Sequence, residues 1–138
     1  MGDFRITGSC QCGAVRYAVT APADEMDHCH CSVCRKSLGA MFGTFATVAR
    51  DAFQIEAGED NLTDHEVTPG VTRRFCRTCG GPIALVPERL PDKLWYMPGT
   101  LDGGDPGHPR ETEIHIFVGS QQPWWRIRDD LPKFDERP

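Results

Sequence analysis

RFCRTCGG, residues 74–81, places two cysteines three positions apart and follows them with two glycines. A Cys-x-x-Cys turn directs two sulfurs toward one point, and the glycines relieve the backbone after the turn. A single pair of this kind is a moderate indication of a metal site. The meaning of this stretch therefore depends on the other cysteines of the chain.

All seven cysteines of the chain fall in three short windows. Tetrahedral zinc holds thiolate sulfurs about 2.3 Å from the ion, which puts neighbouring sulfurs less than about 4 Å apart. Two pairs that lie far apart in sequence, with a third group between them, predict zinc binding more strongly than one pair does. The windows are Cys10-Gln11-Cys12, Cys29-His30-Cys31-Ser32-Val33-Cys34 and Cys76-Arg77-Thr78-Cys79.

The pair Cys10 and Cys12 can share one ion only where the chain bends. In a straight strand the side chains at positions i and i+2 lie roughly 6.5 Å apart, which is too far for two ligands of one zinc. Gly13 follows this pair and permits such a bend. We therefore expect a turn, and not an extended strand, at this point.

The economical division of seven thiols between two ions is four and three. Cys10, Cys12, Cys76 and Cys79 would close one site, and Cys29, Cys31 and Cys34 would form another. A rival division combines one pair with two members of the middle group, and spacing leaves both open. A site with four protein ligands is structural, whereas three ligands leave a position for water or substrate. The middle group is therefore the predicted catalytic site.

A histidine could still close the middle group as a fourth ligand. On an extended chain, His28 and His30 point to the face opposite Cys29 and Cys31. The remaining histidines, His65, His108 and His115, are too distant in sequence to judge. Three thiolates make zinc a weak Lewis acid for ionising water but a good partner for another soft thiolate. This chemistry points to a substrate that carries a thiol.

Short stretches with period-two alternation predict strands with one buried face. In residues 14–20, Val15, Tyr17 and Val19 share a face, and in residues 113–119 the shared face carries Ile114, Ile116 and Val118. Further strand candidates are residues 43–49, 52–56, 71–76, 82–86 and 93–97.

Helices are expected to be few, because fourteen glycines and eleven prolines interrupt the chain. Residues 34–42 and 129–131 are predicted to hold one helical turn each. No linker or internal repeat divides the sequence. We therefore expect a single, mainly β domain over residues 1–138, with short helical turns.

The composition argues against two classes of partner. A formal net charge of −5 opposes binding to a phosphate backbone, and no run approaches the roughly 20 apolar residues of a membrane span. The N-terminal stretch MGDFRITGSC has no apolar run typical of a signal peptide, so we expect a cytosolic protein. Thiols stay reduced in the cytosol, which favours metal binding over disulfides. The oligomeric state is left open.

Taken together, these motifs resemble the glutathione-dependent formaldehyde-activating enzyme family, which also includes centromere protein V. The resemblance spans nearly the whole chain and follows the family's order of motifs. The matching segments are Gly8-Ser9-Cys10-Gln11-Cys12-Gly13-Ala14-Val15-Arg16-Tyr17, Cys29-His30-Cys31-Ser32-Val33-Cys34-Arg35-Lys36, Arg74-Phe75-Cys76-Arg77-Thr78-Cys79-Gly80, Gly99-Thr100-Leu101-Asp102, His115-Ile116-Phe117-Val118 and Pro123-Trp124.

The resemblance implies a compact β-tent fold and two zinc ions per chain. It implies a structural zinc on Cys10, Cys12, Cys76 and Cys79, and a catalytic, more labile zinc on Cys29, Cys31 and Cys34. The implied reaction is the interconversion of formaldehyde plus glutathione with S-hydroxymethylglutathione, a carbon–sulfur lyase activity with glutathione as co-substrate. The expected partner is a small-molecule thiol or thiol adduct.

Glutathione carries two carboxylates, so cationic side chains near the pocket would help to hold it. Arg35 and Lys36, which follow Cys34, are the predicted substrate-binding residues, and Arg73 or Arg74 come second.

Two other functions compete with the lyase. One is a non-enzymatic zinc-binding interaction module whose surface uses Trp95, Trp124 and Trp125. The other is a zinc hydrolase or deaminase. Zinc nucleobase deaminases pair H-x-E with P-C-x-x-C, and neither pattern is present here. The lyase is therefore the leading hypothesis.

Overall fold

Two β-sheets, one short α-helix and five 3-10 turns make up the described part of the computed structural model, residues 3–138. The first two residues of the N-terminal stretch used to predict a cytosolic location lie outside this range. The elements are β1 (Ile6–Ser9), β2 (Arg16–Val19), β3 (Glu25–Cys29), α1 (Ser32–Leu38), β4 (Gly43–Ala49), β5 (Phe53–Ala57), β6 (Leu62–Thr68), β7 (Val71–Cys76), β8 (Pro82–Pro87), β9 (Lys93–Tyr96) and β10 (Glu113–Ile116).

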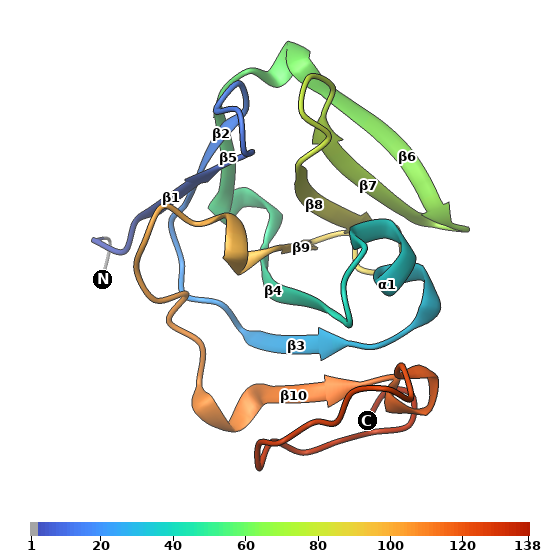
Figure 1. Cartoon of the computed structure of the whole chain (residues 1–138). Helices are drawn as coiled ribbons and strands as arrows, with labels where there is room; N and C mark the ends of the chain where they lie inside the picture. The colour runs from blue at the N-terminus through green and yellow to red at the C-terminus, as the bar shows by residue number, and fades with distance from the viewer. Residues whose placement is uncertain (1–2) are drawn as a thin grey trace.

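The smaller sheet has the strand order β1-β2-β5, and the larger has the order β10-β3-β4-β9-β8-β7-β6. Neighbouring strands are antiparallel except β10, which runs parallel to β3. In Figure 1 the three-stranded sheet lies on one side of the molecule and the β6–β7–β8 part of the large sheet on the other, with β3, β4 and β10 below them. The mainly β fold predicted from alternation is confirmed.

The main hydrophobic core joins the two sheets. Val15, Tyr17 and Val19 are fully buried in it, which confirms that they share an inward face. Tyr17 stacks on Phe53 of β5 with ring centroids 4.7 Å apart, and Tyr96 of β9 lies 6.2 Å from Tyr17. Aromatic rings from both sheets therefore pack against one another at the centre of the domain.

Strand prediction succeeded where the alternation was clear and failed where it was not. The candidates at 43–49, 52–56, 71–76, 82–86 and 93–97 correspond to β4, β5, β7, β8 and β9. Strands β1, β3 and β6 were missed. In β3, for example, neither face is uniformly apolar, because Met26 shares a face with His28 and Cys29 shares one with Asp27.

Two local predictions were wrong. Val118 does not continue the strand with Ile114 and Ile116, because Phe117 takes a left-handed backbone conformation (φ 56°) and ends β10. Residues 129–131 form no helical turn, because the carboxylate of Asp129 instead pairs with His115. The predicted turn in 34–42 exists but begins earlier, as α1. None of the helices within residues 3–138 has the length and apolar character that a membrane span needs.

The two buried tyrosines give a matched test of the core. The Tyr17 hydroxyl bonds to the Thr100 hydroxyl, which itself donates to the Met97 carbonyl (2.8 Å). The Tyr96 hydroxyl, by contrast, finds no partner among the described residues. We expect Tyr17→Phe to lower the free energy of unfolding by about 1 kcal/mol, because it removes a satisfied hydrogen bond.

The same change at Tyr96 removes a buried hydroxyl that has no bond to lose. Tyr96→Phe should therefore leave the free energy of unfolding unchanged within about 0.5 kcal/mol, or raise it. Urea unfolding followed by tryptophan fluorescence measures both variants. A larger loss for Tyr96→Phe than for Tyr17→Phe would contradict this description of the core.

Candidate metal centres

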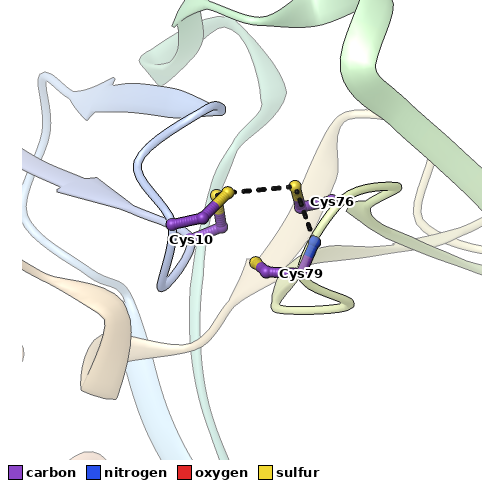
Figure 2. A group of neighbouring side chains, drawn as sticks. Cys10, Cys76 and Cys79 are labelled. Atoms are coloured by element: carbon purple, nitrogen blue, oxygen red, sulfur yellow. Dashed lines mark hydrogen bonds between the residues drawn. The ribbon is translucent and has the colours of Figure 1, made fainter.

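Four cysteine sulfurs gather where the loop between β1 and β2 meets the turn between β7 and β8. Figure 2 shows Cys10 reaching toward Cys76 and Cys79 from the opposite loop. The Cys12 sulfur lies 3.7 Å from the sulfurs of both Cys10 and Cys76, and all four sulfurs lie within 4.8 Å of one another. Sulfurs about 2.3 Å from a shared tetrahedral ion would be about 3.8 Å apart, so the group fits zinc.

Backbone N–H groups point at these sulfurs and favour the thiolate form. Val15 donates to the Cys10 sulfur (3.3 Å), and Gly81 donates to the Cys79 sulfur (3.4 Å). The Cys76 sulfur accepts from the N–H groups of Cys79 and Thr78 and also from the Asn61 amide (3.2 Å). The backbone donors at Cys79 and Thr78 lower the pKa of Cys76 to about 6. Such donors stabilise thiolate ligands once a cation is bound.

The bend predicted after Cys12 is present. Gly13 has a φ of 81°, a conformation that favours glycine, and its N–H donates to the Cys10 carbonyl (3.1 Å). Cys10 and Cys76 are buried in the main core, whereas Cys12 is exposed. The group therefore joins the three-stranded sheet to the seven-stranded sheet from one edge of the core.

The other three cysteines form a second group at the end of β3 and the start of α1. Cys29 is the last residue of β3, Cys31 is the N-cap of α1, and Cys34 lies in its first turn. Their sulfurs lie within 4.8 Å of one another. The structure thus forms a group of four and a group of three, and the rival mixed grouping is not formed.

Of the three sulfurs in the second group, the surroundings of Cys31 favour the thiolate form most. Its sulfur accepts the N–H of Cys34 (3.3 Å) at the helix N-terminus. Hydrogen bonds from the Cys29 and Cys34 thiols, together with the backbone N–H groups of Cys34 and Val33, lower the pKa of Cys31. These donors stabilise the Cys31 thiolate, which is the form that binds a cation.

A pocket of about 330 Å³ opens beside the second group. All three cysteines line it, and each of the seven strands of the large sheet contributes at least one lining residue, so the sheet curls around the pocket. Most of the wall is apolar, with Phe45, Leu85 and Trp95 among its members. The group of four lies outside this lining. An apolar pocket with a few polar groups is typical of a small-molecule site.

Three charged residues of the pocket were missed by the sequence analysis. Asp27 lies two residues before Cys29, on the same face of β3, and burial raises the pKa of its carboxyl group to about 7. The i, i+2 spacing from Cys29 could have identified it. Arg89 and Arg137 line the pocket from distant parts of the chain, and no sequence pattern connects them to the cysteines.

His28 of β3 and His30, which follows the strand, lie away from the pocket that Cys29 lines, as predicted. His30 bonds to His115 (2.9 Å), and His115 bonds to Asp129 (2.9 Å). His28 bonds to Glu113 (2.9 Å) in a separate contact. Burial, together with the neighbouring His115, lowers the pKa of His30 to about 4. Within residues 3–138, no histidine joins either cysteine group.

The predicted substrate-binding cations do not line the pocket. Arg35 donates to the His30 carbonyl (3.4 Å), and Lys36 is exposed on α1. Arg74 pairs with Asp64 (3.1 Å), and the Arg73 guanidinium lies 4.6 Å from the centre of the Phe75 ring. Binding of substrate by Arg35 and Lys36 stays a prediction.

Three comparisons place this chain among known proteins. The family model described as glutathione-dependent formaldehyde-activating enzyme matches residues 5–120. A curated protein of Halomonas elongata, named "Putative glutathione-dependent formaldehyde-activating enzyme", is 27% identical over 130 residues, which cover 88% of this chain and 80% of that protein. A crystal structure of a Rhodobacter sphaeroides protein matches with a TM-score of 0.61 at 26% identity, covering 73% of this chain and 92% of that one.

The two groups should respond differently to the loss of one ligand. Cys76→Ser removes a buried ligand that joins the two sheets, so we expect most of the protein to unfold or become insoluble, because metal binding and folding are coupled. Cys31→Ser should fold and lose one metal ion per chain. Elemental analysis and circular dichroism measure the two outcomes. Equal behaviour of the two variants would contradict the division into a structural and an open site.

Proposed function

Since the chain belongs to the glutathione-dependent formaldehyde-activating enzyme family, we propose that it is a zinc-dependent carbon–sulfur lyase that acts on a thiol adduct. The reaction we assign is the combination of glutathione with formaldehyde to give S-hydroxymethylglutathione, and its reverse. The observation that carries this proposal is the group of Cys29, Cys31 and Cys34, which opens onto the apolar pocket.

In the assigned reaction, the thiol sulfur attacks the carbonyl carbon of formaldehyde. A carbon–sulfur bond forms, the π electrons of the carbonyl move to its oxygen, and that oxygen receives the proton that leaves the thiol. The reverse reaction breaks the same bond and returns the proton to sulfur. Because the two directions balance without an oxidant or a second cofactor, a site that orients one thiol and one carbonyl is sufficient.

The chain supplies orientation and exclusion of water. Zinc bound by the three cysteines would lower the pKa of a substrate thiol and hold its sulfur, since thiolates are ligands that zinc prefers. The Cys31 sulfur accepts an N–H bond at the N-terminus of α1, which fixes its position. Phe45 and Leu85 contribute apolar surface to the pocket wall, which disfavours water there. Asp27 places a carboxyl group on the same side of β3, where its protonated form can donate to a carbonyl oxygen of the substrate and its ionised form can accept from a hydroxyl group.

The group of four cysteines would serve as the structural zinc site, because its four protein ligands leave no position for substrate. We also place the protein in the cytosol, where its free cysteines and a thiol substrate would stay reduced.

One observation favours a non-enzymatic module as the second candidate. Trp124 is 69% exposed, which is unusual for so large an apolar side chain and suits a partner surface. The other two tryptophans do not support that reading. Trp95 lines the pocket, and Trp125 packs against Phe42 with ring centroids 5.7 Å apart. The pocket beside the cysteines therefore favours the lyase.

Exchange NMR tests the lyase directly. With glutathione and formaldehyde at equilibrium, the wild-type protein should speed the exchange between free formaldehyde and S-hydroxymethylglutathione. Cys31→Ser should reduce this acceleration at least about a hundredfold, because the ligand set that orients the thiol is broken.

Trp124→Ala is the control, because Trp124 lies outside the pocket and should not affect exchange. If the wild type gives no acceleration with both metal sites filled, the lyase assignment fails. Loss of acceleration in Trp124→Ala, with Cys31→Ser unaffected, would also contradict it.

A further inference from the structure

Two arginines flank one aromatic ring in the wall of the pocket. The guanidinium carbons of Arg89 and Arg137 each lie 5.6 Å from the centre of the Trp95 ring. They are therefore separated by no more than twice that distance. Contact with an aromatic face orients a guanidinium group and leaves its N–H groups free at the edges.

Neither arginine has an acidic partner within 4.0 Å among residues 3–138, although the chain carries twenty acidic residues. Of the residues that line the pocket, Asp27 is the one carboxyl group, and the Arg137 charge acts on it. The three cysteines of the lining would add negative charge as thiolates, so the positive charge of the pocket is confined to the two guanidinium groups beside Trp95. A local concentration of positive charge favours an anionic group of the ligand.

Arg137 reaches the pocket because residues 129–137 are tied to β10. The N–H of His115 donates to the Pro132 carbonyl (2.9 Å), and the N–H of Phe134 donates to the His115 carbonyl (3.0 Å). The N–H of Phe117 donates to the Glu136 carbonyl (2.9 Å). Figure 1 shows this last segment of the chain running beside β10. The position of Arg137 is thus set by a series of backbone bonds.

The backbone is strained at the residue that supports Arg137. Phe117 is the one non-glycine residue with a positive φ among residues 3–138, and a bulky side chain rarely adopts this conformation. Its ring lines the pocket, and the Arg137 guanidinium carbon lies 5.5 Å from the ring centre. Strain of this kind is concentrated at binding and catalytic sites.

We propose that Arg89 and Arg137 form an anion-binding pair that selects a thiol substrate carrying carboxylate groups. This inference rests on the proposed function, because it names the substrate class of the same pocket. Arginine binds a carboxylate through two parallel N–H bonds, so two guanidinium groups can hold the two carboxylates of one thiol. Glutathione is such a thiol. Arg137 lies beyond residues 5–120, so the family match does not imply this role.

Binding of S-methylglutathione tests the pair without turnover, since its sulfur has no proton to lose. Calorimetry on the metal-loaded protein should show that Arg137→Gln and Arg89→Gln each weaken binding roughly tenfold, as expected for a charged hydrogen-bonded contact at a partly exposed site. Arg128→Gln removes the same charge from an exposed position outside the lining and should leave the affinity unchanged.

Glutathione diethyl ester completes the test, because both of its carboxylates are blocked. The wild type should bind the ester more weakly than glutathione, and Arg137→Gln should weaken ester binding no further. Equal affinity of the wild type for the ester and for glutathione would overturn the inference. So would unchanged S-methylglutathione binding in both arginine variants, an equal loss in Arg128→Gln, or no binding by the wild type.

Failure of the lyase assignment would look different. If the wild type binds S-methylglutathione through the two arginines but does not accelerate exchange with formaldehyde, the proposed reaction fails and the anion-binding pair stands. If exchange is accelerated equally in the wild type and in both arginine variants, and their affinities are equal, the reaction stands and the pair fails.

Discussion

The four-sulfur group is the constraint on which the rest of the structure depends. Cys10 and Cys12 come from the loop that follows β1, and Cys76 and Cys79 from the turn between β7 and β8, so the group joins the two sheets. Four thiolates this close together repel one another unless a cation lies between them. Backbone donors aimed at three of the sulfurs favour the thiolate form, which suits a group that could hold a metal ion.

A second constraint acts through β3, whose two faces serve different purposes. Alternation places Asp27 and Cys29 in the pocket and places His28 and His30 against β10. The network from His30 through His115 to Asp129 attaches the last part of the chain to the same strand. One short strand therefore holds the open cysteine group on one side and the segment that carries Arg137 on the other.

Membership of the family supports the proposed class of reaction, but the choice of substrate depends on the wall of the pocket. The cysteines can bind a thiol sulfur, and the apolar wall can exclude water. Neither feature distinguishes one thiol from another. Recognition of the rest of the substrate falls to the charged residues around Trp95, which lie far from the cysteines in sequence.

The sequence by itself determined the features that depend on short-range spacing. It predicted the mainly β class, seven of the strands, the bend at Gly13 and three cysteine windows with ligand spacing, because ligand spacing and strand period are local properties. Spacing left the division of the cysteines open, and the tertiary structure decided it as four and three. Only the tertiary structure brought Arg89 and Arg137 to one ring and left Arg35 and Lys36 outside the pocket. Those positions depend on how strands distant in sequence pair and how a late segment docks on β10, and local pattern does not carry that information.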